Sequence, residues 1–350
     1  MRCFLAVTFL CSVLGLFPKA AFSVEASRLE AREWGLPNFQ ERELDKDLPI
    51  IDVLVGENQN VWLLGQRSLW LWNLNSNMLQ RVLILWEDKV LDQSKNTEKL
   101  VKLGSDGASI FVGSTRFVYQ IVAVANESAP KVLRYKIPQS SKLQPVAFVG
   151  SGDRFMWLTS NQAFMLDRYG KKLQVVTVAS PFKGSDRVLA DAGGSGLTLT
   201  RDKQIFKVEL NKNAKGEFIL GKPELQQKLT NPVLGLHSLP DGYLVHTAFT
   251  ALRHDTNGKR IQTMPVENDR RLAKITITEK QHGYLFEDGL LEVFDLQAEQ
   301  TRRFQIPADY AKTSSSVHLA GDSNLLVLTD GKIKAYSLTR TVNSPRVSRK

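Results

Sequence analysis

Cysteine is scarce in this chain, with only two among 350 residues, and both lie within the first eleven positions. If the segment that carries Cys3 and Cys11 is removed on export, the mature protein has no cysteine. That absence excludes disulfide bonds, thiolate catalysis and cysteine metal sites. A domain of this size forms a large enough hydrophobic core to fold without such cross-links.

Long apolar runs are also lacking, apart from the fifteen residues from Cys3 to Phe17 that follow Arg2. A run of that length is shorter than the roughly 20 residues that span a bilayer. The small residues Ala21 and Ser23 flank Phe22 just beyond it, a pattern that signal peptidase accepts. The sequence therefore predicts a cleaved signal peptide over residues 1–23. It predicts export to a periplasm or out of the cell, with no transmembrane segment after cleavage.

Acidic residues are fewer than basic ones, with 36 Asp and Glu against 46 Lys and Arg. The net charge is +10, and removal of Arg2 and Lys19 with the signal peptide leaves +8. Positive charge favours anionic partners, so the sequence is compatible with an anionic surface as a partner. Because the basic residues are spread along the whole chain, we expect no specific nucleic-acid partner. Residues 341–350 are predicted to form a basic tail.

Several catalytic motifs are missing as well. The chain has no Gly-x-Ser-x-Gly elbow for a nucleophilic serine. The glycine-rich segment from Asp191 to Gly196 lies between two predicted strands, without the helix N-terminus that would bind a phosphate. No motif that would stack a cofactor recurs, and we therefore expect no cofactor.

What the chain does contain is a repeat. Residues Asn60 to Asn73 read as two apolar strands joined by a tight polar turn, and the residue that closes the second strand recurs every 40 to 47 positions. These closing residues are Asn73, Gln120, Asp167, Glu209, Asp255, Asp295 and Ser337. A large apolar or aromatic residue precedes each of them, except at His254, as expected of strands packed against a neighbouring sheet.

Each repeat unit also contains the preceding strand of the hairpin and an upstream strand. The hairpin strands are predicted at 61–64, 109–112, 155–158, 197–199, 243–245, 284–286 and 325–328. The upstream strands are predicted at 50–55, 100–103, 146–149, 188–190, 233–236, 275–277 and 317–319. Asp288-Gly289 and Asp330-Gly331 are strong hairpin signals, because such turns require positive φ angles. A fourth strand follows the closing residue in most units.

Four short strands per unit, in seven units without amphipathic helices, predict an all-β protein, a seven-bladed β-propeller of four-stranded antiparallel blades over residues 39–340. A β-sandwich would not keep seven near-equal units. The last unit lacks its fourth strand, which we assign to Phe39–Asp45 or, as the alternative, to Leu338–Val342. Residues 24–38 are expected to form a loose or weakly helical lead.

The hairpins resemble those of WD-repeat-type and two-component-regulator-type propellers. In the latter family a turn, an aromatic-rich strand and a glycine follow in order, as in Asn60-Val61-Trp62-Leu63-Leu64-Gly65. The resemblance extends over roughly residues 36–340 at the level of pattern, and it implies the same ring of blades.

Five histidines remain as candidate ligands or catalytic groups, and three of them fall in one repeat unit. Imidazole is a common metal ligand. However, His246 and His254 occupy positions that other units fill with apolar side chains, and no carboxylate stands at a supporting spacing. We therefore predict packed histidines and no metal site.

Ligands of propeller enzymes commonly bind at the central axis, which the innermost strand of each blade borders. The polar residues predicted there are Asp52, Lys102, Asp191, His237, Lys274 and His318. The simpler interpretation is that these residues are solvated, because a fold alone does not establish a site.

The first repeat unit holds four of the six tryptophans, and one of them, Trp86, begins a long polar connection over residues 86–98. An exposed tryptophan is a typical anchor for a protein partner. The leading hypothesis is a monomeric, non-catalytic interaction or scaffold module whose loops, such as 86–98 and 211–216, contact an unknown protein. The alternative is a propeller enzyme (a lyase, a lactonase or a glycan hydrolase) with its site at the axis.

Overall fold

The structure is a computed structural model, and it describes residues 29–30, 32–34, 44, 49–56, 59–84, 98–105, 109–122, 130–137, 145–151, 154–160, 162–167, 173–190, 196–266, 270–321 and 323–338. The predicted signal peptide and basic tail lie outside these ranges, and so do Trp86 and Asp191.

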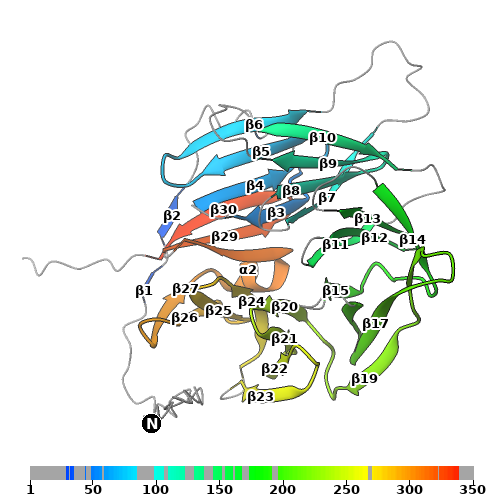
Figure 1. Cartoon of the computed structure of the whole chain (residues 1–350). Coiled ribbons are helices and arrows are strands. Elements are labelled where there is room, and N and C mark those ends of the chain that lie inside the picture. The colour runs from blue at the N-terminus through cyan, green and yellow to red at the C-terminus, as the bar shows by residue number, and fades with distance from the viewer. Residues whose placement is uncertain are drawn as a thin grey trace, which may run out of the picture.

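The described part of the chain is almost entirely β-strand and is arranged as successive antiparallel meanders (Figure 1). The first meander contains β3 (Asp52–Val55), β4 (Asn60–Leu64), β5 (Ser68–Asn73) and β6 (Met78–Ile84). The second contains β7 (Leu100–Ser105), β8 (Ser109–Ser114), β9 (Phe117–Val122) and β10 (Lys131–Lys136). The third contains β11 (Pro145–Ser151), β12 (Arg154–Thr159), β13 (Ala163–Asp167) and β14 (Leu173–Val178).

The next meander contains β15 (Arg187–Ala190), β16 (Gly196–Arg201), β17 (Gln204–Lys212) and β19 (Glu224–Lys228). It is followed by β20 (Gly235–Leu239), β21 (Gly242–His246), β22 (Thr250–Asp255) and β23 (Arg260–Pro265). After these come β24 (Leu272–Ile277), β25 (Gln281–Phe286), β26 (Leu290–Asp295) and β27 (Gln300–Gln305). The short helix α2 (Ala308–Thr313) leads to β28 (Ser316–Ala320), β29 (Asn324–Thr329) and β30 (Lys332–Ser337).

The apolar residues of the hairpin strands face both ways, because successive side chains of a strand point to opposite faces. In β4, Leu63 packs in a cluster with Leu326 and Leu328 of the last sheet, whereas its neighbour Leu64 packs with Leu100 and other residues of the β7–β10 sheet. Similar buried clusters fill the space between every further pair of successive sheets. Each sheet therefore depends on both neighbours to bury its two faces.

The innermost strands close a ring. β3 contacts β7, and contacts continue in order through β11, β15, β20, β24 and β28, which returns to β3. Figure 1 shows the sheets radiating from a common centre, with β3, β11, β15, β20 and β24 near it. A closed ring leaves only the outermost strand of each sheet as an edge.

The sequence prediction of the last strand was wrong in position. The strand beside β30 is β2 (Arg32–Trp34), which pairs antiparallel with it, rather than Phe39–Asp45 or Leu338–Val342. Leu44, from the predicted strand, is buried in the cluster between the first and last sheets. This position therefore packs against the core and does not extend a sheet edge. Leu338 is buried beside β29 instead, with its N–H bonded to the carbonyl of Ser323.

The lead is not the predicted loose or weakly helical segment, because it contains β2 and β1 (Leu29–Glu30). β1 pairs parallel with β27, so the chain upstream of the ring is hydrogen-bonded to two successive sheets.

The predicted contact loop 211–216 is also different in the structure. Its first two residues end β17, and β18 (Phe218–Leu220) follows a turn that the Asn213 side chain stabilises by accepting the N–H groups of Lys215 and Glu217. β18 pairs antiparallel with β17 and parallel with β14 of the preceding meander. Residues 213–216 therefore form a short turn, exposed at 214–216, and the strand β18 that follows it joins the two sheets.

The predicted hairpin turns are confirmed. Gly289 has a φ of 84°, and Asp330 and Gly331 have φ angles of 49° and 72°. Those angles lie in the left-handed region that the Asp-Gly pairs predicted.

Candidate functional site

Five of the six predicted axis residues are described, and all five lie on innermost strands. Asp52 is on β3, Lys102 on β7, His237 on β20, Lys274 on β24 and His318 on β28. The sixth, Asp191, lies outside the described residues, as does the proposed anchor Trp86.

Asp52, Lys102 and His318 form what we call the paired side of the axis. The Asp52 carboxylate lies 3.1 Å from the Lys102 ammonium and accepts the backbone N–H of Leu103 at 2.9 Å. These contacts join β3 to β7, the innermost strands of two successive sheets. Thr276 makes the same kind of bond elsewhere in the ring, because its hydroxyl accepts the N–H of Leu319 at 2.9 Å and joins β24 to β28. The Asp52 carboxylate thus stabilises the ring.

His318 lies close enough to Asp52 and Lys102 to feel both charges. Burial lowers its pKa to about 4, and the opposing effects of Asp52, which raises the pKa, and Lys102, which lowers it, are smaller. Nε2 of His318 is buried without a hydrogen bond from any described residue. The ring is therefore neutral at pH 7 and adds no charge to this side.

Arg187, His237 and Lys274 form what we call the cationic side. Arg187 begins β15, and its guanidinium donates to the carbonyl of Val233, 3.3 Å away. Burial lowers the pKa of Arg187 and of Lys274, and the nearby Arg187 charge lowers the pKa of Lys274 further. Among the described residues, no carboxylate forms an ion pair with either cation.

His237 stacks on His246 of the adjacent strand β21. Their ring centroids are 5.2 Å apart, and Nε2 of His237 lies 3.1 Å from Nδ1 of His246. Burial lowers the pKa of His237 to about 4, and the charges of Arg187, His282 and His318 lower it as well. The pKa of His246 is lowered for the same main reason. Both imidazoles are neutral at pH 7.

Gly235 allows this stack. A Cβ at that position would lie 2.1 Å from the His246 ring and 2.7 Å from Nε2 of His237. The backbone of β20 therefore approaches the two rings more closely than any residue with a side chain could.

The histidines at non-axis positions are packed, as the repeat predicts. His246 and His254 are 2% and 1% exposed. His254 stacks on Tyr243 with ring centroids 4.7 Å apart, and its Nε2 lies 3.1 Å from Oε1 of Gln227 in the preceding meander. Within the described ranges, no group of three or more His, Cys, Asp and Glu side chains could hold a metal ion.

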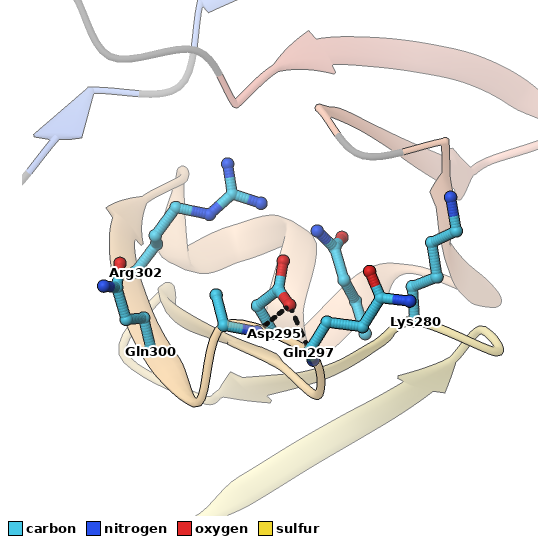
Figure 2. A pocket seen from close by; sticks show the side chains of 7 residues that line it. Lys280, Asp295, Gln297, Gln300 and Arg302 are labelled. Carbon is cyan, nitrogen blue, oxygen red and sulfur yellow. Dashed lines mark hydrogen bonds between the residues drawn. The ribbon is translucent and has the colours of Figure 1, made fainter.

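A pocket of about 310 Å³ lies away from the axis, at the end of the β24–β27 sheet (Figure 2). It is lined by Lys280, Gln281, Asp295, Gln297, Ala298, Gln300 and Arg302. The Asp295 carboxylate accepts the N–H groups of Gln297 and Ala298, each at 2.9 Å, and these bonds lower its pKa. They are the bonds of a hairpin turn, so the carboxylate serves the turn between β26 and β27.

Arg187 is not among the axis residues predicted from the sequence. It stands one residue before the predicted strand 188–190, and a charged residue at a strand end usually points into solvent. Arg187 is indeed exposed, and the contact of β15 with β20 lets its guanidinium reach the carbonyl of Val233, just before β20.

Comparison with known proteins supports the fold. No protein-family model matches the chain, and no curated protein matches it by sequence. Among solved structures, a chain of the mitotic checkpoint complex has a TM-score of 0.52 at 12% identity and covers 91% of this chain and 97% of its own. A catalytically inactive variant of virginiamycin B lyase from Staphylococcus aureus, crystallised with quinupristin, has a TM-score of 0.56 at 12% identity. That match covers 89% of this chain and 100% of the lyase chain.

The fold is a β-propeller. At 12% identity these neighbours show the fold alone, and they include both a protein of an assembly and a lyase. In the described part of the propeller, no helix has the length and apolar character needed to cross a membrane.

Proposed function

We propose that this chain is an exported, seven-bladed β-propeller that acts in a periplasm or outside the cell as a monomeric, non-catalytic protein-interaction module. The four-strand meanders and the buried clusters between successive sheets support the blade count. The apolar segment after Arg2 supports export.

One observation carries the binding role: an aromatic side chain is exposed at the end of the β20–β23 sheet. Phe249, in the turn between β21 and β22, is 45% exposed, and the Arg271 guanidinium lies 5.8 Å from its ring centroid. Leu234, just before β20, is 36% exposed at the same end of the sheet. We call Leu234, Phe249 and Arg271 the Phe249 patch. Aromatic and arginine side chains on a rigid support are typical centres of protein interfaces.

The Phe249 patch is held rigidly. The carbonyl of Phe249 accepts the N–H of Val266, and the carbonyl of Ala248 accepts the N–H of Leu272, at the start of the next sheet. The guanidinium of Arg271 is oriented by Glu287, 3.4 Å away. A preorganised patch loses little conformational entropy when a partner binds.

The axis supports the non-catalytic assignment. Asp52 is the one carboxylate among the predicted axis residues that the structure describes, and it is held by the Leu103 N–H and the Lys102 ammonium. A carboxylate that joins two sheets is poorly placed to act as a general base, which must reach the proton it abstracts.

A capture experiment with a matched control tests this function. Wild-type protein and the Phe249→Ser and Ile261→Ser variants would be used to capture proteins from the exported fraction of the producing cell. Ile261 is 50% exposed on the outer strand β23 of the same sheet, so it controls for the general loss of surface apolar area.

We expect one partner to be retained by wild type and by Ile261→Ser, and its Kd to rise at least 30-fold with Phe249→Ser, as for a hot-spot residue worth roughly 2 kcal/mol. Equal affinity of that partner for all three proteins would refute the role of the patch. A turnover activity that disappears when Asp52, Lys102, His237, Lys274 and His318 are replaced by alanine would refute the non-catalytic assignment.

A further inference from the structure

The outermost strand of the second sheet, β10, is a regular edge. In the described part of the chain, four outermost strands of five or more residues end their sheets: β6, β10, β19 and β23. The pairing of β6, β19 and β23 with the strand inside each of them contains a register shift, whereas β10 pairs with β9 without one. Irregular pairing, as at a β-bulge, protects an edge from a further strand, so β10 lacks a protection that the other three have.

Other outer strands of this ring already have an additional strand beside them. β1 pairs with β27 and β18 pairs with β14, both in parallel. An edge strand presents a row of backbone N–H and C=O groups that its own sheet does not bind. Among the described strands, none pairs with the outer side of β10, which lies on the outside of the ring (Figure 1).

Positive charge further distinguishes β10. Lys131, Arg134 and Lys136 are exposed on it, and the strand contains no acidic residue. Arg116, exposed in the turn between β8 and β9, lies beside the end of β10, because its carbonyl accepts the N–H of Ile137 at 2.9 Å. Among the described residues, no carboxylate forms an ion pair with any of these four cations.

The one acidic residue described on this sheet is already engaged. Glu98, just before β7, accepts the hydroxyl groups of Ser114 and Tyr119, the latter at 2.9 Å. The Arg134 guanidinium is positioned over the Phe117 ring, 4.6 Å from its centroid. The positive charge of the edge is therefore not neutralised within the described part of the sheet.

These charges select between possible occupants of the edge. Lysine and arginine on an edge strand are a common protection against pairing between copies, because two such edges would place like charges opposite each other. A second copy of this chain is thus a poor occupant. A strand that carries carboxylates would instead be attracted.

We propose that β10 binds an acidic, extended polypeptide segment of a protein partner, which adds to the four-stranded sheet as a fifth strand. Backbone hydrogen bonds along the edge supply affinity, and Arg116, Lys131, Arg134 and Lys136 select for carboxylates. The inference rests on the proposed interaction role. It uses a different surface from the Phe249 patch, which lies on the β20–β23 sheet, so either surface can fail without the other.

The probe is a peptide of about eight residues, the length of an ordinary strand, in which glutamate and valine alternate. It is titrated into the full mature protein. We expect its Kd to be at least about tenfold lower than that of a peptide of alternating lysine and valine. N-methylation of the acidic peptide keeps its charge but removes its backbone donors, and it should raise the Kd about tenfold. Hydrogen exchange should slow in residues 131–136 when the acidic peptide is bound.

Arg134→Glu reverses one charge on the edge, and we expect it to raise the Kd of the acidic peptide about tenfold. Lys136→Glu does the same without removing the contact of Arg134 with the Phe117 ring, so it guards against a loss of stability. The matched control is Arg260→Glu, because Arg260 is exposed on the irregular edge strand β23. Phe249→Ser should also bind the peptide as wild type does.

The proposal is overturned if the acidic peptide binds no more tightly than the basic one. It is also overturned if Arg134→Glu and Lys136→Glu both bind the acidic peptide as wild type does, or if Arg260→Glu weakens binding equally. Equal binding of the N-methylated peptide would show attraction by charge alone and would overturn strand addition.

Discussion

The two sides of the axis stand on the same scaffold of innermost strands, yet they balance their charges differently. On the paired side, Asp52 neutralises Lys102 and also holds the Leu103 N–H, so one carboxylate serves both charge balance and ring assembly. On the cationic side, Arg187 donates to the carbonyl of Val233, and neither Arg187 nor Lys274 forms an ion pair with a carboxylate among the described residues.

This difference separates structural polar groups from candidates for binding. A buried polar group that is fully satisfied by the protein stabilises the fold, whereas a group left uncompensated has a cost that a ligand can offset. The repeat therefore supplies equivalent positions around the ring. The residue types at those positions determine whether a polar group is satisfied within the protein, as Asp52 is by Lys102 and the Leu103 N–H.

The largest expected effect concerns the stack on the cationic side. Gly235→Ala would drive a methyl group into the buried His246 ring, and we expect it to lower the free energy of unfolding by about 3 kcal/mol. The control is Gly184→Ala, because a Cβ there meets nothing within 4 Å. Urea denaturation of the two variants measures the difference. An equal change in both variants would show that the close approach of β20 to the two histidine rings does not affect the free energy of unfolding.

A second effect concerns acid stability. His237 and His318, one on each side, have pKa values of about 4 in the folded protein against 6.5 in the unfolded chain. Between these values the unfolded chain binds more protons, so the stabilisation is complete above pH 6.5 and is lost as the pH falls toward 4. We expect a loss of about 2 kcal/mol per histidine at pH 4.5.

Urea denaturation between pH 7.5 and 4.5 measures this loss in wild type and in His237→Gln and His318→Gln. Each variant should lose part of the pH dependence. His246, His254 and His282 also have lowered pKa values and should supply the remainder.

The salt dependence of the two histidine pKa values would sharpen the comparison of the two sides. Added salt screens the Arg187 charge and should raise the pKa of His237, but it should change that of His318 less, because Asp52 and Lys102 act on it in opposite directions. A wild-type free energy of unfolding that did not change between pH 7.5 and 4.5 would contradict the neutral state of the two rings in the folded protein.

The smallest of the three effects tests the paired side. Asp52→Ala leaves the Leu103 N–H and the Lys102 ammonium without their partner, and we expect a loss of about 1.5 kcal/mol in the free energy of unfolding. Asp241→Ala is the control, because it breaks an exposed ion pair with Arg253 and should cost less than about 0.5 kcal/mol. Equal losses in the two variants would show that Asp52 has no special role in joining β3 to β7.

The sequence predicted the strands well because each unit repeats an apolar hairpin whose two faces are both buried. All seven predicted hairpin strands lie within observed strands or coincide with them, from β4 to β29. The upstream strand predicted at Val233–Leu236 begins later, at Gly235, because the N–H of Val233 bonds instead to the carbonyl of Asp202 in the preceding meander. Contacts between units of this kind leave no periodic pattern in a sequence.

The site was harder to predict for the same reason. Asp52 and Lys102 were recognised as axis residues, but their pairing depends on how two sheets 50 positions apart are staggered. Arg187 and the short strand β2 were missed, since neither carries an apolar alternation that distinguishes it from an exposed segment.

The pairing of β2 with β30 has a consequence for biosynthesis. Trp34 lies opposite Ala335, so residues about 300 positions apart in the sequence must meet before the ring is closed. Contacts of such long range carry a large loop-closure entropy and slow the folding of a domain. When the chain is made or exported from its N-terminus, β2 emerges first and cannot pair until β30 has also been made or exported. A truncation that ends before β30 would then expose the edge of the preceding strand to pairing with another chain.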